Sequence, residues 1–176
     1  KLPNPVQQLL KRAAETPNEP YLHQPVKGVW RTWTWSEVAE QAQRMAAALI
    51  GMGLKPGDAV AMTGMNNAHW FMADFACGLA YPGVAACTHS WEALAAANAP
   101  LAKPVERASD AVWSLIYTSG TTGNPKGVIM TADNLAFTVA GVLRDQPPCK
   151  GGEHFLSYLP LAHAFERGAV EIASLY

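Results

Sequence analysis

A loop rich in glycine and hydroxyl side chains, set between two apolar runs, constrains this chain more than any other feature. Residues 111–117 (AVWSLIY) predict a buried strand, residues 118–126 a polar loop, and residues 127–130 a second strand. The eleven residues 117–127 contain four aliphatic hydroxyls, three glycines, one lysine and no acid. Glycines let successive amides converge on an anion, hydroxyls donate hydrogen bonds or ligate Mg²⁺, and lysine adds positive charge. The pattern therefore predicts a polyphosphate-binding loop.

The Walker pattern G-x-x-x-x-G-K-[ST] is absent, because Lys126 follows Pro125 and precedes Gly127. The strand-like residues 128–130 come next, so no helix N-terminus follows the lysine to hold phosphate. A P-loop NTPase is therefore disfavoured. The structural alternative is a solvated loop without a ligand.

Composition places the chain among globular α/β proteins. It has 176 residues, 49% of them apolar and 15% charged, with 13 basic against 14 acidic side chains. This balance shows no basic face, so we expect no nucleic-acid partner. Three cysteines, an odd number without a C-x-x-C pair, favour a reducing compartment, and we expect a cytoplasmic protein. No stretch has the apolar density of a membrane span.

Helical and strand patterns alternate along the chain. Helices are predicted from Pro5, from an N-cap at Ser36, over 68–79 and 91–98, from Thr131 to 143, and from Pro160 to the last residue. The second of these has an apolar stripe of Val38, Ala42, Met45, Leu49 and Met52. Strands are predicted over 21–23, 29–35, 58–63, 111–117, 127–130 and 154–159, with turns at 27–28 and 64–67. This alternation predicts an α/β fold with a largely parallel sheet.

Residues 117–127 (YTSGTTGNPKG) resemble the phosphate-binding motif of the adenylate-forming superfamily, which includes acyl-CoA synthetases, luciferases and peptide-synthetase adenylation domains. Residues 32–38 (TWTWSEV), 53–58 (GLKPGD) and 66–70 (NNAHW) resemble the N-terminal elements of that family. Residues 156–167 (LSYLPLAHAFER) resemble the form found in long-chain fatty acyl-CoA synthetases. The resemblance covers nearly the whole chain.

The resemblance implies a long-chain fatty acid–CoA ligase that uses ATP, Mg²⁺ and CoA. It makes Lys126 and His163 catalytic, Thr118 a Mg²⁺ ligand, and His163 with Glu166 the gate of the acyl pocket. Glu166 would orient His163; alternatively, it pairs with Arg167 or with solvent. The alternative for His163 is a purely structural role at the start of a helix, with its ring bound to a backbone group. The implied ATP-phosphate ligands are Thr118, Ser119, Gly120, Thr121, Thr122, Gly123 and Lys126.

The chain departs from the family pattern in two places. By comparison with the family pattern we expect a βα segment to be missing around residues 80–90, and the family's later motifs and small C-terminal domain are absent, so the implied fold is an incomplete N-terminal AMP-binding domain over 1–176. We expect these residues alone to be inactive. The alternatives are another adenylate former (a medium-chain ligase, an acyl-AMP ligase or a peptide-synthetase domain) and a non-catalytic nucleotide-binding remnant. The sequence leaves oligomeric state and chain-length preference open, and it leaves room for peripheral contact with the membranes in which a fatty acid partitions.

Overall fold

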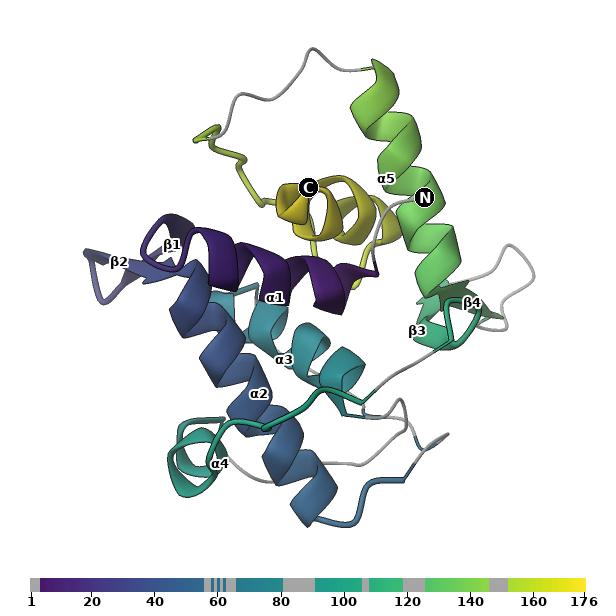
Figure 1. Ribbon diagram of the computed structural model, residues 1–176. Coiled ribbons are helices and arrows are strands. Elements are labelled where there is room, and N and C mark those ends of the chain that lie inside the picture. The colour runs from purple at the N-terminus through teal and green to yellow at the C-terminus, as the bar shows by residue number, and fades with distance from the viewer. Residues whose placement is uncertain are drawn as a thin grey trace. The chain divides into compact units, whose positions relative to one another are not determined.

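The computed structural model describes residues 4–55, 58, 60, 62, 66–80, 91–105, 108–118, 126–145 and 152–176. The chain divides into two compact units, residues 6–106 and residues 1–5 with 107–176, and Figure 1 shows the elements of each. None of the described helices combines the length and apolar content needed to cross a bilayer. The first half of the predicted turn at 64–67, most of the predicted strand over 58–63 and most of the loop before 152 lie outside the described residues.

The unit 6–106 begins with helix α1 (Pro5–Glu15, whose first residue belongs to the other unit) and an antiparallel hairpin of β1 (Pro20–Val26) and β2 (Val29–Thr34). The predicted turn at Lys27 and Gly28 is confirmed, and both residues have positive φ, of 50° and 81°. Two such residues in succession produce the tight two-residue turn whose twist matches the twist of the strands. The hairpin therefore keeps a fixed register up to its tip.

Helix α2 (Trp35–Gly51) begins two residues earlier than the predicted cap implied. The N-cap is Thr34, whose Oγ1 accepts from Glu37 N at 3.3 Å while Thr34 N donates to Glu37 Oε2 at 2.7 Å. Ser36 Oγ instead donates to Pro17 O at 2.8 Å, so the prediction of Ser36 as the cap is wrong. The pattern T-x-x-E of a capping box, present at 34–37, was the signal for this start.

The core of this unit lies where α2 packs against α3 (Ala68–Leu79) and α4 (Trp91–Ala97). The predicted bounds of α3 are confirmed, and Asn67 caps it by accepting from Trp70 N at 2.9 Å. The predicted stripe of α2 is buried except for its last member, Met52, which is exposed beyond the end of the helix. Fully buried side chains from α2 and α3 include Val38, Ala42, Met72, Phe75 and Leu79.

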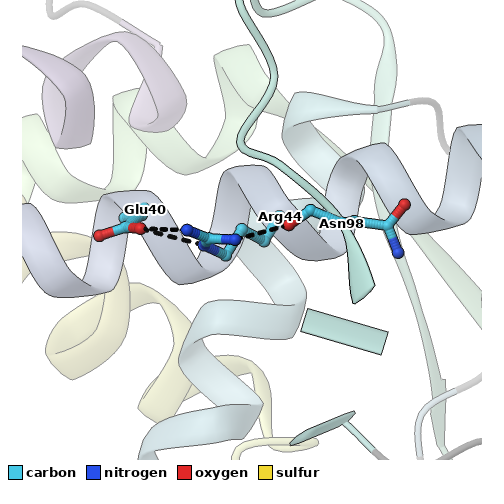
Figure 2. Close-up of polar contacts among 3 residues, drawn as sticks. All are labelled: Glu40, Arg44 and Asn98. Carbon is cyan, nitrogen blue, oxygen red and sulfur yellow. Dashed lines mark hydrogen bonds and ion pairs between the residues drawn. The ribbon is translucent and has the colours of Figure 1, made fainter. Parts of the chain in front are cut away.

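Arg44 ties the end of α4 to α2 (Figure 2). Its Nη1 donates to Asn98 O at 2.7 Å, and its Nε and Nη2 donate to Glu40 Oε1 at 3.0 and 2.7 Å. Asn98 follows the last residue of α4, so the guanidinium satisfies a carbonyl that the helix leaves unpaired. The short α4 thereby keeps a defined position against α2.

The other unit contains an antiparallel hairpin of β3 (Val112–Thr118) and β4 (Lys126–Thr131), followed by α5 (Ala132–Asp145). The two strands flank the polar loop as predicted. Both described sheets are two-stranded and antiparallel, so the prediction of a largely parallel sheet is wrong for the described residues. Alternating strand and helix patterns indicate α/β structure, but they do not exclude a strand that pairs with its neighbour through a hairpin.

The chain ends in a π-helical segment, η1 (Glu166–Ile172), and a short 3₁₀ turn, η2 (Ala173–Leu175), both packed on α5. Gly168 of η1 lies against Thr138 of α5, at a distance where a Cβ on it would make an ordinary van der Waals contact of 3.5 Å with Thr138 Cγ2. The prediction of a strand over 154–159 is wrong: these residues form no strand, and Phe155, Leu156 and Tyr158 are exposed. A strand needs a ladder partner, and no described strand pairs with this apolar run.

Candidate functional site

The ends of the predicted phosphate loop are held together by the β3–β4 ladder. Thr118 closes β3, Lys126 opens β4, and the two residues are paired across the ladder. The backbone hydrogen bonds of the hairpin therefore fix both ends of the loop. Five of the predicted phosphate ligands lie between these ends and outside the described residues: Ser119, Gly120, Thr121, Thr122 and Gly123.

Tyr117 and Gly127 form the next pair along the ladder. A Cβ on Gly127 would lie 3.4 Å from two ring carbons of Tyr117, so the tyrosine ring lies over the glycine backbone. A side chain larger than methyl at 127 would displace this ring. The Lys126 side chain, next to this contact, is exposed.

The far end of the hairpin is anchored to the start of α5. Thr131 Oγ1 accepts from Asn134 N at 3.1 Å and Thr131 N donates to Asn134 Oδ1 at 3.1 Å, which confirms the predicted cap at Thr131. Ser109 accepts from Asp133 N at 2.8 Å through its backbone oxygen and donates to Asp133 Oδ2 at 2.7 Å through its hydroxyl. Because α5 also contacts η1, one helix connects the loop-bearing hairpin to the segment after His163.

His163 is exposed and lies in the turn before η1. Its backbone N donates to Pro160 O at 2.7 Å, and its Nδ1 accepts from Phe165 N at 3.2 Å. An amide can donate only to an unprotonated ring nitrogen, so the neutral imidazole carries its proton on Nε2. His163 is therefore oriented by the backbone and has Nε2–H as a hydrogen-bond donor.

Glu166 lies in a different environment from His163. Its side chain is fully buried, and neither carboxylate oxygen has a hydrogen-bond partner among the described residues. In the described part of the chain no hydrogen bond or ion pair joins Glu166 to His163. The His163 imidazole instead accepts a hydrogen bond from Phe165 N. The buried Arg167 lies 4.0 Å from Glu171 Oε2, so this arginine pairs within η1 with a residue the sequence analysis did not single out.

The unit 6–106 contains a cavity of about 630 Å³ that the sequence analysis did not identify. Its walls include His69, which stacks on Trp91 at 5.5 Å between ring centroids and meets the edge of Trp33 at 6.3 Å. Burial lowers the pKa of His69 below its usual 6.5, the Arg31 charge lowers it further, and Glu92 opposes both. No single-residue pattern points to this cavity, because its wall comes from five elements: β1, β2, α2, α3 and α4.

The AMP-binding enzyme family model matches residues 9–81 and 81–176. The chain belongs to this family. The match includes β3, β4 and the sequence between them. It falls in two parts that meet at residue 81.

Curated relatives include long-chain and aromatic acyl-CoA synthetases. The chain is 42% identical over 64 residues to long chain acyl-CoA synthetase 8 of Arabidopsis thaliana, covering 36% of this chain and 9% of that protein. It is 29% identical over 181 residues to feruloyl-CoA synthase of Amycolatopsis sp, covering 81% and 37%. It is 28% identical over 211 residues to a long-chain-fatty-acid–CoA ligase of Mycobacterium tuberculosis, covering 86% and 35%. The chain thus spans well under half the length of these relatives.

Solved structures of adenylate-forming ligases share the fold. Fatty acyl-adenylate ligase from L. pneumophila, in complex with acyl adenylate and pyrophosphate, matches with a TM-score of 0.75 and 19% identity, over 98% of this chain and 38% of that one. o-Succinylbenzoate CoA synthetase from Bacillus subtilis, in complex with its acyl-adenylate intermediate, matches with a TM-score of 0.78 and 23% identity, over 96% and 53%. The described residues therefore form a mixed α/β portion of the N-terminal domain of this fold.

Proposed function

We propose that the whole protein is a long-chain fatty acid–CoA ligase. In the first step a carboxylate oxygen attacks the α-phosphate of ATP, giving acyl-AMP and pyrophosphate. In the second the thiol of CoA attacks the acyl carbon, giving the thioester and AMP. One observation carries the proposal: the β3–β4 ladder pairs Thr118 with Lys126 and so presents the glycine-and-hydroxyl loop between two fixed ends.

The first step demands neutralisation of charge, because an anion attacks an anion and a polyanion leaves. Donors placed where charge develops in the transition state meet that demand. We assign this role to the Lys126 ammonium, to the amides of Gly120 and Gly123, and to the hydroxyls of Ser119, Thr121 and Thr122. All of these come from the loop and the first residue of β4.

Thr118 is the residue we assign to Mg²⁺. A hydroxyl oxygen is a hard donor, and Mg²⁺ commonly takes few protein ligands together with the phosphates of its substrate. The described residues contain no group of three or more acidic, histidine or cysteine side chains that could hold a metal by itself, which fits an ion brought in with the nucleotide. When bound, Mg²⁺ supplies positive charge at the phosphate oxygens.

We assign His163 to the mouth of the acyl pocket. Because its Nδ1 accepts from Phe165 N, its Nε2–H can donate to a carboxylate oxygen of the acid or to the acyl-adenylate carbonyl. Glu166 stays a proposed gate residue that acts through the packing of η1, since its buried carboxylate makes no described contact with the imidazole.

Two acid classes compete as the substrate. The segment 156–167 and the long-chain relatives favour a fatty acid, whereas the feruloyl-CoA synthase match favours an aromatic acid. Pyrophosphate exchange into ATP with hexadecanoate, decanoate and ferulate separates them, and dependence of product release on CoA separates a CoA ligase from an acyl-AMP ligase. A protein that binds ATP but shows no exchange with any acid would instead be a nucleotide-binding remnant.

The test of the site is Lys126→Ala in the full-length protein, with Lys55→Ala as the matched change of another exposed lysine. We expect Lys126→Ala to slow acid-dependent exchange by roughly a hundredfold or more, as loss of a transition-state charge contact does. The free energy of unfolding should change by less than about 0.5 kcal/mol, because an exposed side chain contributes little to stability. Equal exchange rates in the two variants would remove Lys126 from the reaction.

A further inference from the structure

The tip of the β1–β2 hairpin exposes a compact group of apolar side chains next to basic ones. Val29 and Trp30 are each 71% exposed and Val26 is 39% exposed. Lys27 and Arg31 lie within the same short segment, and no acidic residue occurs between Glu19 and Glu37. An exposed indole and two valines beside two cations form an amphipathic surface rather than a scattered set of surface residues.

The register divides these apolar side chains between both faces of the ribbon. Val26 pairs with Val29 on one face, and Pro25 pairs with Trp30 on the other, because side chains alternate along a strand. A flat protein surface would cover only one of the two faces. A medium that surrounds the hairpin end covers both at once.

The backbone of the tip tolerates such an environment. The ladder runs through the Val26–Val29 pair, so the strands are hydrogen-bonded up to the turn, and the turn itself is only Lys27 and Gly28. Both strands are edges of a two-stranded sheet, so their outward-facing N–H and C=O groups need water or lipid headgroups as partners, which limits the tip to the polar–apolar boundary of a bilayer. Trp side chains favour that boundary, since the ring is apolar and its N–H needs a polar partner.

We propose that the β1–β2 tip docks end-on into the surface of a membrane that contains anionic lipids. Val26, Val29 and Trp30 enter the boundary between headgroups and acyl chains, while Lys27 and Arg31 pair with lipid phosphates. Contact of this size is weak and reversible. The inference goes beyond the proposed reaction and does not depend on which acid is activated.

Sedimentation of the full-length protein with phosphatidylcholine vesicles, with and without phosphatidylglycerol, tests the proposal. We expect binding to the anionic vesicles that weakens at high salt. Val29→Ser with Trp30→Ser should lower the partition coefficient about tenfold or more. The matched control is Phe137→Ser, which removes another exposed apolar side chain (82% exposed, in α5) and should leave binding unchanged.

A second pair of variants tests how much the positive charge of the tip contributes to vesicle binding. Lys27→Gln should lower binding to anionic vesicles roughly fivefold and leave binding to neutral vesicles unchanged, following about 1 kcal/mol for each basic residue near such a surface. Lys55→Gln changes a lysine beyond the far end of the 17-residue α2 and should have no effect. Equal loss of binding in both lysine variants would point to net charge rather than the tip and would overturn the proposal.

Lipids brominated on their acyl chains give a positional readout. They should quench part of the tryptophan emission of the bound protein, and Trp30→Phe should abolish that part while the protein still sediments. Failure of the parent protein to bind anionic vesicles, or quenching that survives Trp30→Phe, would overturn the docking of this tip. If the reaction and the docking are separate, every tip variant should exchange pyrophosphate into ATP at the rate of the parent protein when no vesicles are present.

Discussion

His69 is held by rings on two sides and by charges of both signs. It stacks on Trp91, meets the edge of Trp33, and lies 4.0 Å from Glu92 Oε1. Loss of water lowers its pKa more than the neighbouring carboxylate raises it, so burial dominates and the imidazole stays neutral near pH 7. The aromatic stack therefore forms around an uncharged ring.

We expect NMR titration of the full-length protein to give His69 a pKa below 6.5, with the resonance assigned by its loss in His69→Gln. Glu92→Gln should lower this pKa further, because it removes the one charge that favours the protonated ring, and Arg31→Gln should raise it. Between the folded and unfolded pKa values the unfolded chain binds more protons, so this residue makes the fold less stable as pH falls below about 6.5. A pKa at or above 6.5 would show that burial does not dominate.

Glu166 and Glu171 are both fully buried in η1, but their partners differ. The carboxylate oxygens of both glutamates have no hydrogen-bond partner among the described residues, but Glu171 Oε2 lies 4.0 Å from Arg167 Nε, at ion-pair distance, and no described cation pairs with Glu166. Burial without a partner costs free energy, and loss of one member of a buried pair costs more. The two glutamates should therefore respond in opposite directions to the same substitution.

We expect Glu166→Gln to raise the free energy of unfolding by about 1 kcal/mol, and Glu171→Gln to lower it by about 3 kcal/mol. Urea unfolding of the full-length protein, followed by tryptophan fluorescence, measures both. If Glu166 also serves as a gate through the packing of η1, the more stable variant should turn over more slowly. A loss of stability in Glu166→Gln would mean that the carboxylate has a partner outside the described residues.

At the level of elements, the start of α2 depends on the reciprocal bonds between Thr34 and Glu37. We expect Thr34→Ala to lower the free energy of unfolding by about 1 kcal/mol, because it leaves one N-terminal amide without its acceptor. Ser36→Ala is the comparison, since Ser36 Oγ donates to Pro17 O and lies 3.1 Å from Thr34 Oγ1 but accepts from no amide of the helix. If circular dichroism during urea unfolding shows Ser36→Ala to be the more damaging change for α2, the assignment of the cap is wrong.

Local patterns predicted those elements that local interactions stabilise. Helix α3, with Asn67 before it and an apolar run within it, was predicted to the residue, and so was the turn at Lys27 and Gly28. Residues 154–159 have as good an apolar run as β3 but form no strand. The difference lies in the partner: β3 has β4 one loop away, and a ladder partner is not a property of the strand's own sequence.

In the candidate site, too, local sequence predicted some residues and missed others. Glycine, hydroxyl and lysine chemistry within one loop predicted the residues that the β3–β4 ladder presents, because the whole loop is contiguous in sequence. The environment of Glu166 was not predictable, since its burial depends on how η1 packs against other segments. The stack of His69 on Trp91 was missed for the same reason, as 21 positions separate the two rings along the sequence.

At the scale of the molecule, we propose that a βα segment is missing around residues 80–90 relative to other family members. Two observations support this. The family match splits at residue 81. The alignment to the mycobacterial ligase has 211 positions but includes 86% of 176 residues, about 151, so about 60 positions have no counterpart in this chain. An intact mass well above 18.9 kDa for the protein purified from its source would support a longer native chain.

One apolar face of the β3–β4 hairpin is exposed, and a longer chain would have to cover it. Leu115 and Ile129 pair on one face, 45% and 60% exposed, and Tyr117 continues that face. The apolar run over 111–117 predicted a buried strand, but only Trp113 and Ile116 are buried, whereas Leu115 and Tyr117 are exposed, so that prediction is only partly right for the described part of the chain. Exposed apolar strand faces promote association with other apolar surfaces.

We therefore expect a polypeptide of only these 176 residues to bind the dye ANS strongly, to self-associate, and to show no acid-dependent exchange of pyrophosphate into ATP. Leu115→Thr with Ile129→Thr should reduce the dye fluorescence severalfold and reduce self-association, because the polar side chains keep the strand propensity while removing the apolar face. Val26→Thr is the control, since it lies on the other hairpin and should leave the dye signal nearly unchanged. Fluorescence and light scattering measure the two effects, and a monodisperse polypeptide with acid-dependent exchange would show that these residues suffice for the reaction.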